Sequence, residues 1–246
     1  FEKGAGTYVD GATDLPFNMA LGATRDPRIV YRSAALTSKE AKAMGVHIVF
    51  APVLDVNNNP KNPVINARSF GENAEMVATL GVAAINGYQD NGILATGKHF
   101  PGHGNTRIDT HAKLGIIEST SEEFESIELL PYKKVLREAK PSAIMSAHLW
   151  VKSIDSDTLP ATLSNKVMTG LLRQRLGFDG VIYTDAMVMG GITTRYPFDV
   201  AVVKAIQAGC DVILFPGSVE KGIEALRAGV KNGDLSEERI TESVRR

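Results

Sequence analysis

The chain has 246 residues, 43% of them hydrophobic and 22% charged, so it can bury the core of one domain or at most two. Its 27 basic and 28 acidic residues nearly cancel, which leaves no basic stripe to neutralise phosphates and argues against nucleic acid as a partner. The lone cysteine, Cys210, excludes a disulfide framework and a multi-cysteine metal site, and no apolar run reaches the length of a membrane helix.

Along the chain, helices are predicted where a capping residue or a proline precedes an apolar periodic segment and a glycine follows it. In the helix that begins at Thr120, Pro131 is expected to cause a kink or a division. In chain order, the predicted helices cover residues 26–45, 73–92, a segment beginning at 120, and residues 164–177, 202–208, 218–233 and 236–246.

Five short apolar segments between these helices are predicted to be strands. They cover residues 48–53, 93–99, 143–147, 180–185 and 211–215. Because each is brief and the crossovers are helical, the strands are expected to be parallel and covered on both faces. A closed (β/α)8 barrel needs eight such units, typically in about 250 residues or more. We therefore expect an α/β fold of the TIM-barrel type, one catalytic domain over residues 1–246 that lacks its N-terminal strands.

Residues with catalytic potential lie where the predicted strands end. In chain order they are Asp55, Lys98, His99, His148 and Asp185. In a parallel barrel the carboxyl ends of the strands share one face, so these side chains are expected to gather there. Each is weak evidence alone, since a strand-end aspartate more often caps the next helix and a lone histidine more often packs in the core.

Two sharper motifs do not hold. Residues 92–98 have the glycine and lysine spacing of a phosphate-binding loop, but His99 replaces the Ser or Thr that would bind magnesium. His99 and His103 have the spacing of a helical zinc pair, but Pro101 and Gly102 between them disfavour a helix. A minor alternative is a metal site built from His99, His103, His111 and Asp185.

Two features favour catalysis on a sugar. Asp109 stands two residues before His111, a spacing that lets the carboxylate orient the ring and stabilise its protonated form, as a general acid/base requires. Asp185 ends an apolar strand, which is typical of a carboxylate nucleophile held in a pocket. Sugar hydroxyls need several fixed polar partners around an oxocarbenium-like transition state, and these would be Arg68, Lys98 and His99.

Together these motifs resemble the signature of glycoside hydrolase family 3, in its bacterial β-N-acetylglucosaminidase branch. The resemblance covers nearly the whole chain, and the matching segments follow the family's order. They are residues 50–57, 62–63, 68–71, 98–104, 109–111, 146–148 and 184–187.

The resemblance implies a retaining mechanism on a (β/α)8 barrel, with no metal and no organic cofactor. Asp185 would be the nucleophile that forms a glycosyl-enzyme intermediate, and His111, paired with Asp109, would be the acid and then the base. By the same match, Arg68, Lys98 and His99 would bind the sugar. The implied function is removal of terminal β-linked N-acetylglucosamine from cell-wall or chitin-derived glycans, as in peptidoglycan recycling.

Three alternatives stay open at this point. A histidine acid/base becomes uncharged when it loses its proton, so an anion such as phosphate would meet no repulsion, and the enzyme could be a glycoside phosphorylase. A β-glucosidase of the same family is a second alternative, and a non-catalytic sugar-binding barrel is a third. Residues 3–6 carry no arginine, where many family members have Gly-Gly-Arg, and the family's sugar-binding Asp would precede Phe1. The sequence does not decide between the bacterial cytoplasm and the periplasm or cell envelope as its location, and the oligomeric state is not predicted.

Overall fold

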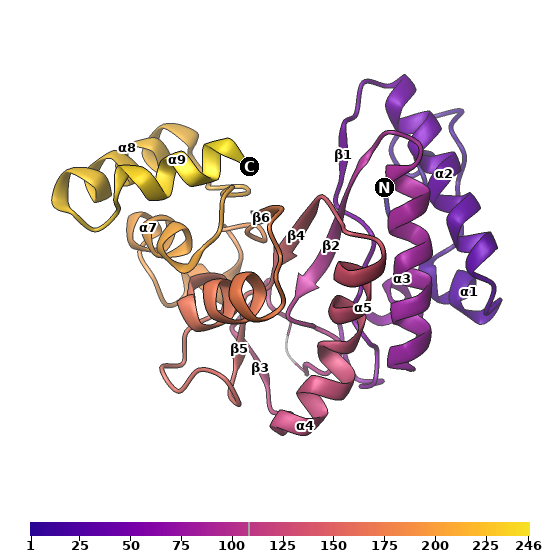
Figure 1. The fold of residues 1–246 in the computed structure, drawn as a ribbon, viewed down its shortest axis with the longest axis horizontal. Coiled ribbons are helices and arrows are strands. Elements are labelled where there is room, and N and C mark those ends of the chain that lie inside the picture. Colours follow the sequence, from indigo (N-terminus) through magenta and orange to yellow (C-terminus); the bar gives the residue numbers. More distant parts are fainter. Residues whose placement is uncertain (108) are drawn as a thin grey trace. The chain divides into compact units, whose positions relative to one another are not determined.

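The computed structural model of the chain describes residues 1–107 and 109–246 and has an α/β fold (Figure 1). The chain divides into two compact units. The first unit comprises residues 1–105 and 122–144, and the second comprises residues 106–121 and 145–246. Strand β4 (Ala143–Ser146) and the short helix α4 (Ser121–Glu123) lie across the divisions.

The first unit contains a parallel strand pair that carries polar residues at its carboxyl end. Strand β1 (Ile48–Val49) pairs with β2 (Leu94–Phe100) in the register Ile48 to Leu94 and Val49 to Ala95. The pairing resumes at an isolated bridge between Val53 and Lys98. Asp55 therefore follows a segment that runs beside β2, as the sequence predicted.

Helices α1 (Asn18–Ala23), α2 (Pro27–Ala43), α3 (Ala74–Gln89) and α5 (Leu130–Glu138) pack in this unit, with α3 between α2 and α5 (Figure 1). The caps are those predicted, because Asp26 accepts a hydrogen bond from the Arg28 N–H and Asn73 accepts one from the Met76 N–H. A Cβ on Gly87 would lie 2.5 Å from the Tyr31 carbonyl oxygen, so glycine lets α3 approach α2 closely.

Pro131 divides the predicted helix rather than kinking it. A π-helical stretch at Phe124–Glu128 precedes α5, and Pro131 occupies the first turn of α5, where its missing N–H costs no hydrogen bond. The Tyr132 ring packs edge-on against Phe100 of β2, with the ring centroids 5.0 Å apart. Helix α5, which begins after the break, therefore packs on β2, the strand that carries Lys98 and His99.

The second unit contains strand β6 (Val181–Tyr183), which ends two residues before Asp185. A parallel bridge joins Tyr183 to Val212. Helices α7 (Phe198–Ala208) and α8 (Val219–Asn232) pack on each other, and α9 (Glu237–Arg245) packs on α7 (Figure 1). The side chain of Ser218 begins α8 and Gly233, in the left-handed conformation, ends it, both as predicted.

Several arginines in this unit surround one buried carboxylate. The side chain of Asp211 is fully buried and receives hydrogen bonds from Arg173 and from the Ser243 hydroxyl, with an ion pair to Arg239 at 3.4 Å. Arg239 also donates to the Cys210 carbonyl oxygen at 2.7 Å. These bonds tie α9 to the end of α7, and Cys210 is buried as the sequence indicated.

Three local features differ from the predictions. The segment 211–215 contributes a single bridge at Val212 in place of a strand, and the predicted helix 164–177 is a π-helix at Lys166–Arg175 after a 3-10 turn at Ala161–Leu163. A second parallel pair, β3 (Gly115–Ile117) with β5 (Leu149–Val151), was not predicted. Both strands are only three residues long and lie within segments that resemble loops. Three residues are too few to show the alternation of apolar and polar residues that predicts a strand. None of the described helices is long and apolar enough to cross a membrane.

Candidate active site

Arg68 is held at its backbone by helix α1. The Asn18 side chain donates a hydrogen bond of 2.7 Å to the Arg68 carbonyl oxygen. A Cβ on Gly22 would lie 1.8 Å from the Phe70 carbonyl oxygen, so α1 and the segment after Arg68 are in close contact that only glycine permits. Ser69 donates a 2.6 Å hydrogen bond to the Asp55 carbonyl oxygen. The guanidinium of Arg68 therefore projects from a fixed main chain.

Glu2 binds both of the predicted sugar-binding cations. Its carboxylate accepts from Arg68 Nε at 2.9 Å and from Nη2 at 2.7 Å, a bidentate arrangement. The Lys98 ammonium nitrogen lies 2.6 Å from Glu2 Oε1. Burial raises the pKa of Glu2, but the hydrogen bonds from Arg68 and the charge of Lys98 outweigh it and hold that pKa well below its usual range. Glu2 is therefore a carboxylate at neutral pH that draws Arg68 and Lys98 together.

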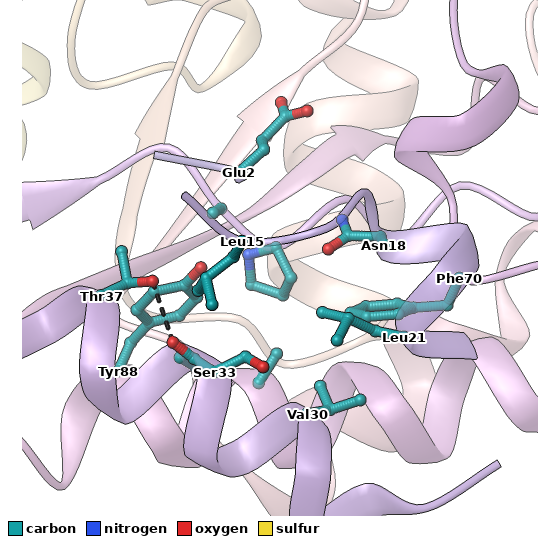
Figure 2. A pocket seen from close by; sticks show the side chains of 13 residues that line it. Glu2, Leu15, Asn18, Leu21, Val30, Ser33, Thr37, Phe70 and Tyr88 are labelled. Atoms are coloured by element: carbon teal, nitrogen blue, oxygen red, sulfur yellow. Dashed lines mark hydrogen bonds between the residues drawn. The ribbon is translucent and has the colours of Figure 1, made fainter. Parts of the chain in front are cut away.

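The pocket next to Glu2 is too small for a sugar. Figure 2 shows the Glu2 carboxylate pointing away from a pocket lined by Leu15, Leu21, Val30 and Phe70, among others. Its volume is about 10 Å³, which is room for about one water molecule. The polar groups of Glu2, Arg68 and Lys98 therefore lie outside this pocket, and it is part of the packing between α1, α2 and α3.

A fully buried carboxylate orients His99. Asp55 Oδ2 lies 2.7 Å from His99 Nδ1, and Asp55 Oδ1 accepts from the backbone N–H of His99 at 3.2 Å and of His103 at 2.7 Å. Burial raises the pKa of Asp55, but the charge and hydrogen bond of His99 outweigh this effect, and the pKa of Asp55 lies below its usual value. Because a carboxylate only accepts, the His99 ring carries a proton on Nδ1 and turns Nε2 toward Arg68, whose Nη2 is 3.4 Å away.

The second unit contains the Asp109 and His111 pair. Asp109 Oδ1 lies 2.7 Å from His111 Nδ1 and accepts from the His111 backbone N–H at 2.9 Å. The side chain of His111 is 63% exposed, so solvent and ligands can reach its ring. Since the carboxylate can only accept, Nδ1 carries a proton and Nε2 is the atom that can exchange a proton with a ligand. The predicted pair is therefore formed.

Asp185 is half-buried, two residues beyond β6, and its Oδ1 accepts a hydrogen bond of 2.8 Å from the Ala186 N–H. His148 contacts the next peptide unit, because its Nε2 lies 3.1 Å from the Ala186 carbonyl oxygen. A carbonyl only accepts, so His148 carries a proton on Nε2, and its Nδ1 lies 2.9 Å from the Thr162 hydroxyl oxygen. The structure thus fixes the main chain next to Asp185 through a buried histidine.

The structure gathers the predicted residues in two groups, each within one unit. Arg68, Lys98 and His99 cluster in the first unit, while Asp109, His111 and Asp185 belong to the second. In the part of the chain that the structure describes, no group of three or more His, Cys, Asp or Glu side chains could hold a metal ion.

Sequence reasoning missed two contributors. Glu2 stands in a short polar segment at the beginning of the chain, and its role depends on residues 66 and 96 positions further along, so no local pattern reveals it. His148 was noted at the end of its strand without a role. The available signal for His148 was a titratable residue at the end of an apolar segment.

The family model described as "Glycosyl hydrolase family 3 N terminal domain" matches residues 1–246. The chain is 34% identical to the Beta-N-acetylglucosaminidase/beta-glucosidase of Cellulomonas fimi, over all of this chain and 45% of that protein. Its structure is similar to a glycoside hydrolase family 3 beta-N-acetylglucosaminidase from Paenibacillus sp. str. FPU-7, with a TM-score of 0.93 and 43% identity over 96% of this chain and 45% of that one.

A beta-glucoside phosphorylase, BglX, bound to 2FGlc is also similar, with a TM-score of 0.94 and 29% identity over 99% of this chain and 45% of that one. The chain thus spans less than half the length of each of these three proteins. The predicted fold class is confirmed, since the matched domain is a (β/α)8 barrel of the TIM type. The chain belongs to the N-terminal domain family of the glycosyl hydrolase family 3 proteins.

Proposed function

We propose that the protein is a retaining β-N-acetylglucosaminidase that removes terminal N-acetylglucosamine from cell-wall or chitin-derived glycans. The hydrogen bond of 2.7 Å between Asp109 and His111 carries the proposal, because it supplies an imidazole acid/base on a loop that is bonded to the segment after the carboxylate candidate Asp185. Two of the similar proteins are named beta-N-acetylglucosaminidases, which supports N-acetylglucosamine as the sugar that is removed. Residues 1–246 would form one catalytic barrel domain, and Arg68, Lys98 and His99 would bind the sugar hydroxyls.

In the first step the Asp185 carboxylate attacks the anomeric carbon. The bond from that carbon to the leaving oxygen breaks, and His111 Nε2 gives its proton to that oxygen. Asp109 Oδ1 holds Nδ1–H throughout, so the proton that moves is the one on Nε2. The hydrogen bond from the Ala186 N–H to Asp185 Oδ1 orients the carboxylate for attack.

In the second step a water molecule attacks the anomeric carbon of the glycosyl-enzyme ester. His111 Nε2 takes the water proton, and the bond to Asp185 breaks with its electron pair returning to the carboxylate. The two inversions leave the product with the configuration of the substrate. His111 ends the cycle protonated and Asp185 ends it ionised, which restores the starting state.

A panel of aryl β-glycosides that differ at the 2-position tests the sugar. The expected result is a kcat/KM for the N-acetylglucosaminide at least about tenfold above that for the glucoside, since a hydrogen-bonded acetamide group contributes on the order of 1.4 kcal/mol or more. Clear preference for the glucoside contradicts the proposal and favours a β-glucosidase. Sugar binding without turnover of any member favours a non-catalytic barrel.

Phosphorolysis is the second candidate, favoured by the similarity to a phosphorylase and by a histidine acid/base that is uncharged after its proton leaves. In that reaction a phosphate oxygen, rather than water, would attack the glycosyl-enzyme ester. Product analysis with and without phosphate decides between the two. Sugar 1-phosphate as the main product identifies a phosphorylase, and free sugar at an unchanged rate identifies a hydrolase.

A further inference from the structure

The loop that carries His111 is attached to the segment that follows Asp185. The backbone N–H of Gly190 donates to the His111 carbonyl oxygen at 2.9 Å, and the N–H of Gly191 donates to the Thr110 carbonyl oxygen at 3.0 Å. Two consecutive main-chain bonds therefore hold two consecutive residues of the loop. They fix the backbone of the histidine directly, independently of its bond to Asp109.

The same short segment is attached to Asp185 at its other end. The carbonyl oxygen of Ala186 accepts from the Met189 N–H at 3.0 Å and contacts His148 Nε2 at 3.1 Å. The N–H of Met187 donates to the Leu214 carbonyl oxygen at 2.9 Å. A hydrogen-bonded turn from Ala186 to Met189 thus follows Asp185, and Gly190 and Gly191 come directly after it as the first residues of helix α6 (Gly190–Thr193).

Glycine is needed at positions 190 and 191 because neighbouring atoms leave no room for a Cβ, and not because the backbone has a conformation that only glycine adopts. Neither has a positive φ, so an alanine could adopt the same backbone. A Cβ on Gly190 would lie 2.3 Å from the Ala112 carbonyl oxygen and 2.8 Å from that of His111. A Cβ on Gly191 would lie 2.9 Å from His148 Cβ and 3.2 Å from the Thr110 carbonyl oxygen. Any side chain here must displace the loop or the buried histidine.

The part of the loop that carries His111 is an exposed turn. Thr106 and Thr110 are buried, whereas residues 111–113 are exposed. The Ala112 and Lys113 N–H groups both bond to the Asp109 carbonyl oxygen, which makes residues 109–113 a compact turn. A clash at Gly190 therefore acts on an exposed turn that can shift as a body, and it carries His111 with it.

We propose that Gly190 and Gly191 are positioning residues that set where the acid/base histidine stands relative to the nucleophile, by docking the loop backbone onto the start of α6, directly after the turn that follows Asp185. This inference rests on the proposed roles of His111 and Asp185. It goes beyond them in assigning a specific function to two residues that touch no substrate. Displacing the loop impairs proton transfer and leaves nucleophilic attack intact.

The test compares Gly190→Ala and Gly191→Ala with His111→Ala, in the full-length protein and on two N-acetylglucosaminides. One has a 2,4-dinitrophenyl leaving group, which departs without protonation, and the other has a poor, basic leaving group. Gly170→Ala is the matched control, because the nearest atom to a Cβ there is 3.7 Å away. Thermal unfolding of every variant reports whether the fold is kept.

For Gly190→Ala we expect kcat/KM to fall about 10²-fold on the poor leaving group and less than about threefold on the dinitrophenyl glycoside, the range that general acid catalysis contributes. Azide, which needs no base, is expected to raise kcat on the dinitrophenyl substrate and to give the glycosyl azide. Gly191→Ala is expected to show the same pattern, and Gly170→Ala is expected to match the unchanged protein.

Suppose that His111→Ala loses activity mainly on the poor leaving group. If the two glycine variants then lose activity equally on both substrates, or lose none, the inference is overturned and the proposed function stands. Absence of the pattern in His111→Ala itself overturns both. Amide hydrogen exchange on the unchanged protein is an independent measurement that needs no variant. Slow exchange at the Gly190 and Gly191 N–H groups supports docking of the loop, and exchange at the rate of an open chain contradicts it.

Discussion

Oδ1 of Asp109 lies 2.7 Å from His111 Nδ1 and 2.9 Å from the His111 backbone nitrogen, so a single carboxylate oxygen fixes both the ring and the main chain of the histidine. The arrangement holds the proton on Nδ1 and leaves Nε2 for the ligand. In the proposed mechanism it also stabilises the imidazolium that forms when Nε2 takes a proton from water. Both properties depend on the negative charge of Asp109.

Asp109→Asn is therefore expected to reduce kcat/KM by about 10²-fold on glycosides with poor leaving groups and much less on activated ones. The amide keeps the size of the side chain but can present a donor to Nδ1, which favours the wrong tautomer. The control is Asp157→Asn, which removes an exposed carboxylate that pairs with Lys166 at 3.0 Å in the same unit. Identical kinetics for the two variants would contradict the role of Asp109.

Glu2→Gln is expected to raise KM about tenfold with a smaller change in kcat, because the neutral amide no longer draws Arg68 and Lys98 together. Lys98 is 7% exposed, so little solvent is available to take the place of a lost carboxylate partner. Asp26→Asn is the matched control, since it removes the carboxylate of an exposed pair with Arg28 while an asparagine still caps the helix. A KM unchanged in Glu2→Gln would contradict the assignment.

The stability difference between the unchanged protein and Glu2→Gln is expected to depend on pH. The pKa of Glu2 in the folded state lies below the ordinary value of 4.5, so its contribution to the free energy of unfolding is fully present above that value. It is lost as the pH falls through the folded-state pKa. Urea unfolding should therefore give a constant difference from about pH 7 to pH 5 that shrinks below about pH 4. A difference that grows toward acid would contradict this prediction.

Asp55→Asn is expected to lower the free energy of unfolding by about 3 kcal/mol, because Asp55 is fully buried and holds His99 Nδ1 together with two backbone N–H groups. The loss should be largest near neutral pH and decrease in acid, since the pKa of Asp55 is lowered in the folded state. Denaturant unfolding at several pH values measures it. Loss of less than about 1 kcal/mol would show that backbone partners, and not the charge, hold this segment.

His148→Leu is expected to reduce kcat about 10²-fold on good and poor leaving groups alike, because the main chain beside Asp185 loses the donor to the Ala186 carbonyl oxygen. His148→Gln can still place a donor there and should recover part of the loss. This uniform pattern differs from the leaving-group pattern expected for the glycines. A loss confined to poor leaving groups would place His148 with the acid/base instead.

Much of the chemistry could be predicted from the sequence, since motif residues such as Lys98, His99 and the Asp109 and His111 pair are adjacent or nearly so. Helix limits were predicted well where local chemistry decides them, as at Asp26, Ser218 and Gly233. In these cases the capping bond or left-handed turn involves residues within a few positions. Tertiary packing therefore has little influence on where these helices begin and end.

Features that depend on residues distant in the sequence could not be predicted. Glu2 acquires its role from Arg68 and Lys98, and Gly190 acquires its role from a loop about 80 residues earlier, contacts that only the fold creates. The strand expected at 211–215 is reduced to the bridge at Val212, because Asp211 is engaged by arginines and Phe215 has a positive φ that interrupts extended backbone.

The central claim is that Asp185 forms a covalent bond to the sugar, and trapping tests it most directly. A 5-fluoro N-acetylglucosaminyl fluoride keeps the 2-acetamido group and slows the second step, so the intermediate accumulates. Intact mass of the full-length, active protein should rise by one sugar, and peptide mapping should place that sugar on Asp185, with no label in Asp185→Asn. An active protein that turns over substrate without labelling, or a label on another residue, would contradict the account.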